Sequence, residues 1–391
     1  MRLLVALPRF PWPLEKGDKL RAWFQLKGLA ENHEIHLVCL SEDKVSDADL
    51  EQVSFCKTVQ VIHLPKLKIA WNLFGALFNR LPFQVNYYKS NKMRRVIADT
   101  IAKHNIEGNF VQLIRLGENL PFEASDFWVL DYMDTFSIGM QQRIANSKFW
   151  ARPLVKSETR RLRAYESSIA AKFDEMTIIS DRDADGLPSA IRSHLHIIPN
   201  GVSESFFEDL PRPETKDFDL IFFGNMGYHP NVQGAKWLME EVLPILHERG
   251  IRPKICIAGA RPAAVVKSFE GPEVTVTGFV DDIRTYVLRS KVSVVPLVGG
   301  QGLQNKLIES MALGVPVITT PLSNSALGAE SGKELLVCDG PQAFAEGIID
   351  LLSNAEKGAQ LVVNSRKFVE ENFRWQAMNA KLEKVLAKKD S

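Results

Sequence analysis

The chain has 391 residues, more than the ~100–200 of one typical domain, so its length predicts two domains. A hydrophobic content of 45% and a charged content of 24% exclude a largely disordered chain. The formal net charge of +1 excludes a general nucleic-acid coat protein, whose domains are strongly basic, so no nucleic-acid partner is expected. No apolar run approaches ~18 residues, so no transmembrane helix is predicted.

Two further features suggest a cytoplasmic protein. The apolar start of the chain is interrupted by prolines and lacks a small-residue cleavage site, so we do not expect a signal peptide. The four cysteines form no C-x-x-C pair, and three of them lie in apolar runs. This usage is typical of reduced core residues in a reducing compartment.

In the first half of the chain, short β-like runs alternate with helical patterns. A strand at 2–7, a helix at 18–31 and a strand at 34–40 form the first unit of this kind. Further strands are predicted at 59–63, 110–114, 127–130, 176–179 and 195–198, with helices at 91–104 and 152–172.

The second half repeats this alternation after a segment rich in proline and acidic residues, 200–217, which we interpret as a linker. Strands are predicted at 218–224, 253–259, 273–278, 292–297, 315–319 and 335–338, and helices at 231–247, 281–290, 303–313 and across 341–388. Alternating strands and helices indicate an α/β protein with parallel sheets. We therefore expect two Rossmann-like domains, 1–199 and 218–372, that face each other across a cleft.

Sheets of this kind bind ligands at the carboxyl ends of their strands, which directs attention to the loops there. The loop after the first strand, residues 8–18, lacks the G-x-G-x-x-G dinucleotide fingerprint. Gly17 nevertheless stands just before a predicted helix, where a backbone can approach an anion closely. A structural turn explains this glycine equally well.

The segment 292–320 carries the strongest chemical signal. A buried strand leads into Gly299-Gly300-Gln301-Gly302, which opens a helix whose exposed amides can hold a diphosphate. Lys306 near the helix start opposes the helix dipole unless a phosphate is bound. Glu309 lies on the same face and can accept both hydroxyls of a ribose. The alternative is a solvated Lys306–Glu309 pair that contributes ~0.2–0.5 kcal/mol.

This segment resembles the nucleotide-binding segment of retaining GT-B glycosyltransferases of the family 4 kind. The residues that carry the resemblance are GLQNKLIESMALGVPVIT, which begins at Gly302. Four other stretches agree in order, namely IPNGV at 198–202, FFGNMG at 222–227, IAGARP at 257–262 and VTGFVDD at 276–282. The first half matches more weakly, through Gly17 and the segment 130–137.

The resemblance implies a transferase that moves a sugar from a nucleoside-diphosphate sugar to an acceptor hydroxyl with retention, in polysaccharide or glycolipid biosynthesis. It also implies that a C-terminal helix at 373–389 packs back on the first domain. No cofactor is expected, and no divalent metal is demanded, because no D-x-D-like motif lies in a fitting loop. Lys306 would stabilise the leaving group. The implied donor-binding residues are Gly17, Gly224, Asn225, Arg261, Phe279, Val280, Gly300, Gln301, Gly302, Leu303, Gln304, Asn305 and Glu309.

The chain departs from the family pattern at two places. Gln301 stands where the family has the first glutamate of its E-x7-E motif, and an amide carries no charge. The usual Arg and Lys after the first strand of the second domain are missing from 225–231. The remaining cations for the diphosphate are Lys306 and Arg261, which we place at the start of a helix over 260–269.

The first domain is expected to bind the acceptor, a glycan or a lipid-linked sugar. Asp131 and Asp134 follow a buried strand, so one of them is a candidate general base. Capping of a helix over 135–146 explains this pair equally well. Asp18 and Arg115, which follow two other strands, are candidate acceptor-binding residues.

Two other functions remain open at this stage. A nucleotide-sugar epimerase has the same fold but isomerises the sugar, so analysis of the product separates it from a transferase. A non-catalytic nucleotide-sugar-binding partner binds nucleotide without turnover. The missing fingerprint disfavours an NAD dehydrogenase.

The positive charge is concentrated in residues 57–115, where ten Lys and Arg stand against Asp99 and Glu107, a balance of +8. Within this segment, Trp71, Phe74 and Phe78 fall on one helical face. Basic residues beside an apolar face are typical of an interfacial helix on anionic lipid, at the inner face of the membrane. The alternative is a helix that packs this face on its own domain.

Overall fold

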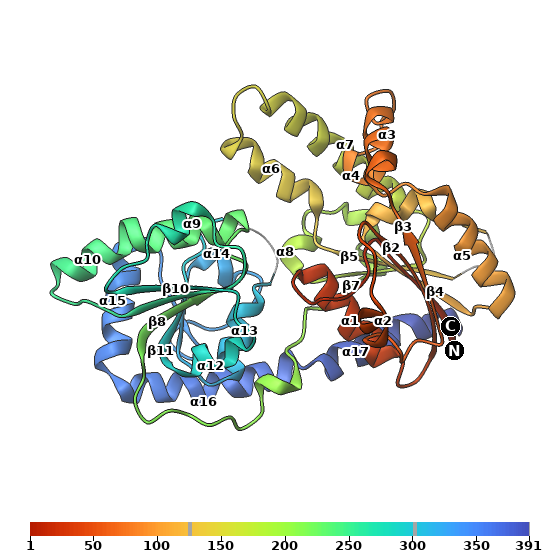
Figure 1. The fold of residues 1–391 in the computed structure, drawn as a ribbon. Helices are drawn as coiled ribbons and strands as arrows, with labels where there is room; N and C mark the ends of the chain where they lie inside the picture. The colour runs from red at the N-terminus through yellow and green to blue at the C-terminus, as the bar shows by residue number, and fades with distance from the viewer. Residues whose placement is uncertain (124–126, 300–302, 391) are drawn as a thin grey trace. The chain divides into compact units, whose positions relative to one another are not determined.

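The computed structural model describes residues 1–123, 127–299 and 303–390 (Figure 1). The chain forms two compact units. The first comprises Met1–Pro199 together with Trp375–Ser391, and the second comprises Asn200–Arg374. We call them the first and the second domain.

The first domain contains a seven-stranded sheet in the order β3-β2-β1-β4-β5-β6-β7, in which all neighbouring strands are parallel. Along β1, Leu4 and Ala6 enter one hydrophobic cluster while Leu3 and Val5 enter another, so both faces of the sheet are covered. The strands are β1 (Arg2–Leu7), β2 (Glu34–Ser41), β3 (Thr58–His63), β4 (Gly108–Gln112), β5 (Trp128–Met133), β6 (Glu175–Ile178) and β7 (Leu195–Ile197).

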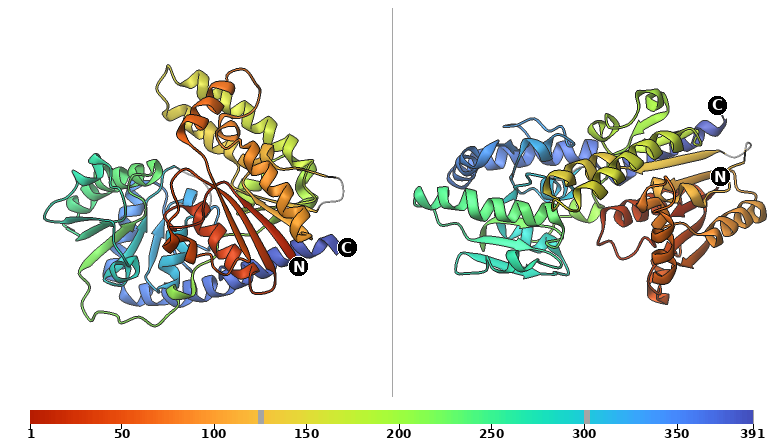
Figure 2. Two further views of the ribbon diagram at one scale, coloured as in Figure 1. Left: turned by 45° about the vertical axis from the view of Figure 1, so that its right-hand side comes forward. Right: turned by 90° about the horizontal axis from the view of Figure 1, so that it is seen from above.

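Helices from both ends of the chain cover this sheet (Figure 2). The C-terminal helix α17 packs on α1, where Trp375 stacks on Phe24 with ring centroids 5.0 Å apart. The helices are α1 (Gly17–Leu29), α2 (Asp47–Glu51), α3 (Lys66–Gly75), α4 (Phe83–Tyr87), α5 (Asn91–His104), α6 (Phe136–Asn146), α7 (Arg152–Ala170), α8 (Asp181–Ala184) and α17 (Trp375–Leu386).

The second domain contains a six-stranded parallel sheet in the order β10-β9-β8-β11-β12-β13. Leu220 and Phe222 of β8 face one cluster and Ile221 and Phe223 face the other, the pattern of a strand buried on both sides. The strands are β8 (Phe218–Phe223), β9 (Ile255–Ala258), β10 (Val274–Gly278), β11 (Ser290–Val295), β12 (Val317–Thr319) and β13 (Leu336–Val337).

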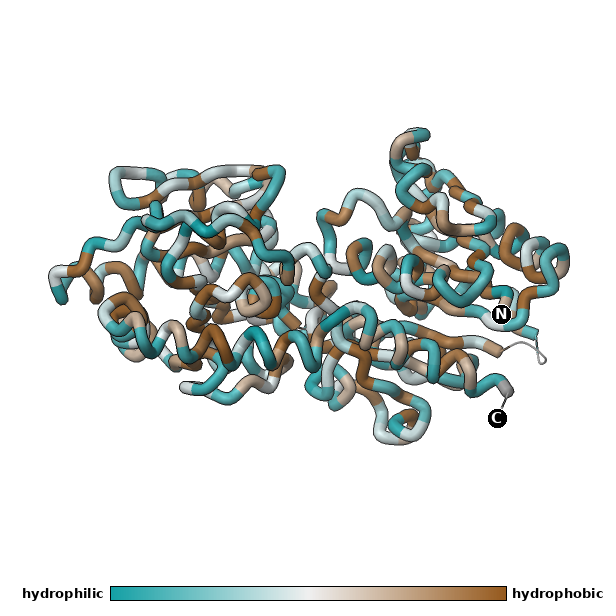
Figure 3. Tube along the Cα trace, turned by 90° about the horizontal axis from the view of Figure 1, so that it is seen from below, coloured by the Kyte–Doolittle hydropathy of each residue, from teal (hydrophilic) through white to brown (hydrophobic). Residues whose placement is uncertain are grey.

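The helices of the second domain alternate between hydrophobic and hydrophilic segments along their turns, as expected for helices that cover a sheet (Figure 3). They are α9 (His229–Trp237), α10 (Leu243–Glu248), α11 (Ala264–Lys267), α12 (Ile283–Leu288), α13 (Asn305–Ala312), α14 (Pro321–Asn324), α15 (Gly340–Ser353) and α16 (Ala355–Asn372).

Two predicted helices of this domain differ from the structure. The helix expected over 231–247 contains a π-helical turn at Leu238–Val242, one turn before Pro244, which has no N–H to donate to the preceding turn. The helix expected over 260–269 is reduced to α11, because Arg261 has a φ of +55° and Pro262 follows it. Arg261 therefore lies in a loop, not at the start of a helix.

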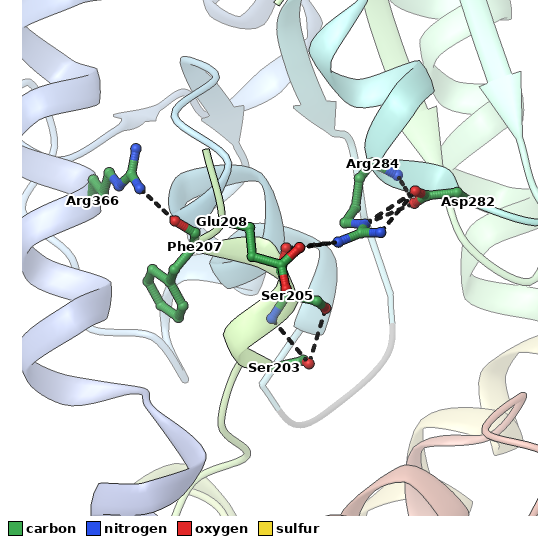
Figure 4. A network of polar contacts seen from close by, with 7 residues as sticks. All are labelled: Ser203, Ser205, Phe207, Glu208, Asp282, Arg284 and Arg366. Atoms are coloured by element: carbon green, nitrogen blue, oxygen red, sulfur yellow. Dashed lines mark hydrogen bonds and ion pairs between the residues drawn. The ribbon is translucent and has the colours of Figure 1, made fainter. Parts of the chain in front are cut away.

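Residues 200–217, predicted as a linker, are fastened to the second domain. Arg284 donates to the carbonyl of Ser205 at 2.8 Å and pairs with Glu208 at 3.3 Å, while Arg366 donates to the carbonyl of Phe207 at 2.8 Å (Figure 4). The Phe207 side chain is buried in the core of this domain. The segment is therefore part of the second domain rather than a free connection.

The α/β class with two parallel-sheet, Rossmann-like domains is confirmed. Within the described ranges, no helix is both long enough and apolar enough to cross a bilayer.

Candidate functional site

The second sheet has a topological switch point between β8 and β11, because the chain runs from β8 outward to β9 on one side and later to β11 on the other. Ligands of open α/β sheets bind at the carboxyl ends of the strands at such a point. Gly224 and Asn225 follow β8, and α13 with Lys306 and Glu309 follows β11. Gly224, Asn225, Lys306 and Glu309 therefore lie at this edge.

Lys306, the second residue of α13, is held in a buried position with 8% of its surface exposed. Its ammonium group donates to Asn231 Oδ1 at 2.9 Å and to Gln304 Oε1 at 3.4 Å, and lies 5.6 Å from the centroid of the Phe222 ring. Burial lowers the pKa of Lys306 to about 8. A cation held by neutral partners at a helix N-terminus is arranged to meet an anion.

Glu309 lies one turn further along α13 and is half-buried. Burial raises the pKa of its carboxyl to about 7, and the positive charge of Lys306 opposes this shift. No hydrogen bond or ion pair with another described residue engages this carboxylate. A solvated Lys306–Glu309 pair is therefore not what the structure shows, because Lys306 is buried and no ion pair joins it to Glu309.

Glycine turns bring the backbone of the switch point close to Lys306. Gly224 has a φ of +143°, and a Cβ added there would lie 3.0 Å from Asn231 Nδ2 and 3.3 Å from Lys306 Cε. Gly259, at the end of β9, has a φ of +132°, and a Cβ there would lie 1.8 Å from the carbonyl oxygen of Gly224. Only glycine fits this close approach.

The structure describes some of the other predicted donor residues and not the rest. Phe279, just after β10, has 69% of its surface exposed, and Val280 beside it is half-buried. Leu303 is buried, and Asn305 accepts from Asn200 at 3.3 Å. Gly300, Gln301 and Gly302 lie outside the described residues.

The first sheet has its own switch point between β1 and β4. Gly17 begins α1 after the loop that follows β1, and Arg9 in that loop pairs with Asp18 at 2.5 Å. Arg115 follows β4 and donates to Gln84 Oε1 at 2.7 Å. The two guanidinium groups lie 5.7 and 5.6 Å from the Tyr88 ring centroid, which joins Asp18 and Arg115 in one cluster.

Asp134 belongs to the same edge, one residue beyond β5. Its Oδ1 atom is buried without a hydrogen-bond partner. Burial, followed by the negative charge of Asp183, raises the pKa of Asp134 to about 7, and Arg115 opposes this shift. Helix capping does not explain this residue, because α6 begins after Thr135 without any side-chain cap. An unpartnered carboxyl that titrates near neutrality is a candidate acid–base group.

Backbone strain marks the same edges of the two sheets. Four described non-glycine residues have a positive φ, and three of them, Leu113, Met133 and Arg261, lie at or just beyond the ends of β4, β5 and β9. Leu113 precedes Arg115 by two residues, and Met133 immediately precedes Asp134. Strain of this kind costs ~1–3 kcal/mol per residue and concentrates at functional sites.

The environment of Asp131 does not fit its predicted catalytic role. Its carboxylate accepts from Arg21 Nε at 2.7 Å, from Arg21 Nη2 at 3.0 Å and from Thr177 Oγ1 at 2.8 Å, and all three side chains are buried. Both oxygens are thus occupied inside the sheet. This arrangement favours a structural role for Asp131 and leaves Asp134 as the candidate base.

The sequence interpretation missed four residues of these clusters. Asn231 links Lys306 to the backbone of Asn225, to which its Nδ2 donates at 2.9 Å, and Asn200 contacts Asn305. Arg9 and Tyr88 complete the cluster of the first domain. A weak signal existed for Asn200 and Arg9, because each follows a predicted strand. In the described part of the chain, no group of three or more His, Cys, Asp or Glu residues is placed to hold a metal ion.

Comparisons with known proteins concern the fold and the second domain. Residues 217–354 match the family described as glycosyl transferases group 1. An uncharacterised 44.6 kDa protein in the cps region of Klebsiella pneumoniae is 19% identical over 384 residues, which cover 95% of this chain and 96% of that protein.

Two solved structures share the fold. Sucrose-phosphate synthase from Thermosynechococcus elongatus superposes with a TM-score of 0.72 at 16% identity and 99% coverage of both chains. Anabaena Alr3699/HepE in complex with UDP has a TM-score of 0.69 at 13% identity, covering 99% of this chain and 100% of that chain. Together, the family match of the second domain and these neighbours support a glycosyltransferase with the GT-B fold.

Proposed function

We propose that this protein transfers a sugar from a nucleoside-diphosphate sugar to an acceptor hydroxyl with retention of anomeric configuration. The observation that carries the proposal is the placement of the buried Lys306 and the half-buried Glu309 on α13, at the switch point of the second sheet. The match of this domain to glycosyl transferases group 1 and the UDP and UDP-glucose complexes of the Anabaena protein support it.

In this proposal the diphosphate lies at the N-terminus of α13 beside Lys306. Its negative charge favours the charged form of the lysine and so opposes the lowering of its pKa by burial. The bond between the anomeric carbon and the diphosphate oxygen breaks, and charge on the leaving group grows toward the transition state. Lys306 therefore stabilises the transition state more than the bound donor.

Glu309 accepts hydrogen bonds from the ribose hydroxyls, and these bonds compensate for the burial of its carboxylate. The exposed Phe279 ring and the Val280 backbone offer a surface for the base. The helix N-terminus and Lys306 supply the positive charge in this proposal, so no divalent metal is demanded.

The acceptor, a glycan or a lipid-linked sugar, is assigned to the switch point of the first sheet. Asp134 takes the acceptor proton, since a base is most effective when its pKa lies near the working pH. Arg115 and Asp18 orient the acceptor. The new bond forms between the acceptor oxygen and the anomeric carbon on the face that the diphosphate leaves.

A nucleotide panel followed by product analysis tests this function. One of UDP, GDP, ADP or dTDP at 100 times its dissociation constant should stabilise the protein by ~2.7 kcal/mol in thermal unfolding. The matching nucleotide sugar should then give a glycosylated acceptor and free nucleoside diphosphate. An isomerised sugar would identify an epimerase, and tight binding without turnover would identify a non-catalytic partner; either result refutes the proposal.

A further inference from the structure

Large apolar side chains are exposed at two places in the first domain. Twelve described large hydrophobic residues are exposed, and eight of these lie in two short segments of this domain. The first segment, 66–80, comprises α3 and the turn after it, and exposes Trp71 (70%) and Phe78 (77%). The second, 147–156, comprises the α6–α7 connection and the start of α7, and exposes Trp150 (68%). We call these segments the two apolar tips.

The rings of the first tip contact one another rather than the core. Phe74 lies 6.1 Å from Trp71 and 5.3 Å from Phe78, centroid to centroid. The opposite face of α3 is the buried one, through Ile69 and Asn72. The helix is therefore already anchored to the domain, and its aromatic face is left without a partner in this structure. The alternative that this face packs on its own domain is wrong.

Helix α7 begins in the second tip and runs toward α3 and α4 (Figure 1). Arg161 of α7 donates to the carbonyls of Ala76 at 2.8 Å and Leu81 at 3.1 Å, and so fastens the turn of the first tip. Glu158 accepts from the backbone of α4 at 2.8 Å and lies one helical turn after Leu154 of the second tip. The two segments that expose apolar residues are thus fastened to each other through α7.

The charge around the tips has a single sign. Residues 64–98 contain seven Lys or Arg and residues 135–157 contain four, and neither stretch contains Asp or Glu. The whole chain, by contrast, has a net charge of +1. Lys66, Lys68 and Arg80 of the first tip are exposed, as are Lys148 and Arg152 of the second. Long basic side chains at the border of exposed aromatic rings match an anionic lipid surface, with the rings among the acyl chains and the charges at the headgroups.

We propose that the two apolar tips dock this protein on a membrane that carries anionic lipids. The proposal rests on the exposure and charge of the first domain alone and does not depend on the proposed transfer reaction. Neither tip contains a residue assigned above to donor or acceptor.

Vesicle binding tests this proposal directly. The full chain should sediment with vesicles of phosphatidylcholine mixed with phosphatidylglycerol, and not with phosphatidylcholine alone. Raising the salt from 0.1 M to 1 M shortens the Debye length from ~10 Å to ~3 Å and should release the protein. Trp71 and Trp150 are the exposed tryptophans, so their emission should shift to the blue on binding. Absence of sedimentation with anionic vesicles at low salt would overturn the proposal.

A charge variant distinguishes binding through the tips from a general attraction of the protein to anionic lipid. Each basic residue near an anionic surface changes the partition constant about fivefold, so the combined change of Lys66, Lys68 and Arg80 to Gln should weaken binding tenfold or more. The matched control replaces three exposed lysines elsewhere, Lys267, Lys381 and Lys384, with Gln. Equal losses in both variants would overturn the assignment to the tips.

An apolar variant tests insertion. Trp71→Ser with Trp150→Ser should abolish stable binding while leaving nucleotide affinity unchanged, and Val363→Ser, on the exposed surface of the second domain, should leave both intact. Sedimentation velocity in the absence of lipid tests whether a second copy of the chain binds this face instead. A dimer of the parent chain that the tryptophan variant dissociates would overturn the membrane assignment in favour of self-association.

Discussion

Replacing Asp134 with Asn should stabilise the protein and inactivate it. Burial raises the pKa of Asp134 from 3.8 to about 7, so the folded state binds the proton more tightly than the unfolded state does. Because the folded-state pKa is the higher one, ionisation of this carboxyl destabilises the folded protein as the pH rises above 3.8. The loss of unfolding free energy grows by ~1.4 kcal/mol per pH unit until the folded-state pKa is reached. The penalty then stays at its maximum of ~4 kcal/mol above pH 8. Asparagine carries no such penalty.

Denaturation of both proteins at several pH values, followed by tryptophan fluorescence, measures this difference. The free energy of unfolding of Asp134→Asn, relative to that of the parent, should rise by ~2–3 kcal/mol from pH 5 to pH 7 and stay constant above pH 8. Transfer should fall by ~10²–10⁴-fold. Asp131→Asn is the control, and it should destabilise the protein rather than stabilise it. It leaves Arg21 buried without its charged partner and should lower the free energy of unfolding by ~3–5 kcal/mol. A stability difference that is independent of pH would refute the assignment of a tuned base.

Three further substitutions test the rest of the account. Lys306→Met should lower kcat by ~10²–10³-fold with a smaller effect on donor binding, and a raised donor KM at normal kcat would show that Lys306 only binds. Gly224→Ala should cost ~1–3 kcal/mol of stability and weaken donor binding, since its φ of +143° is strained for alanine and the Cβ would crowd Asn231 and Lys306; a fully stable variant with normal affinity would contradict this. Trp375→Ala removes a buried ring stacked on Phe24 and should destabilise the first domain by ~3–5 kcal/mol in urea denaturation, a loss that normal stability would disprove.

The sequence predicts the sheets because their strands are buried on both faces and appear as short apolar runs. It also places Lys306 and Glu309 on one helix after such a run, and α13 does begin at Asn305. Boundaries shift by a few residues, as for β11, which starts at Ser290 rather than at 292. These features depend on local pattern alone.

Features that depend on distant partners could not be predicted in this way. Asn231 holds Lys306 across 75 positions of the chain, and Arg21 reaches Asp131 across 110. No periodicity reveals such pairs, so Asp131 and Asp134 are equivalent in the sequence although one is paired and the other is not. The direction of the Trp71 face was likewise left open, because an amphipathic pattern does not say what covers it.

The central claim is that Lys306 and Glu309 on α13 bind the nucleoside diphosphate of the donor. Calorimetric titration of the nucleotide that stabilises the parent chain tests it, with Glu309→Ala as the variant and Glu356→Ala, an exposed position on α16, as the control. The loss of hydrogen bonds to a charged group should weaken binding by ~1.5–3 kcal/mol, or about 10–150-fold, in the first variant, with no change in the control. Unchanged affinity in a folded Glu309→Ala protein would contradict the claim.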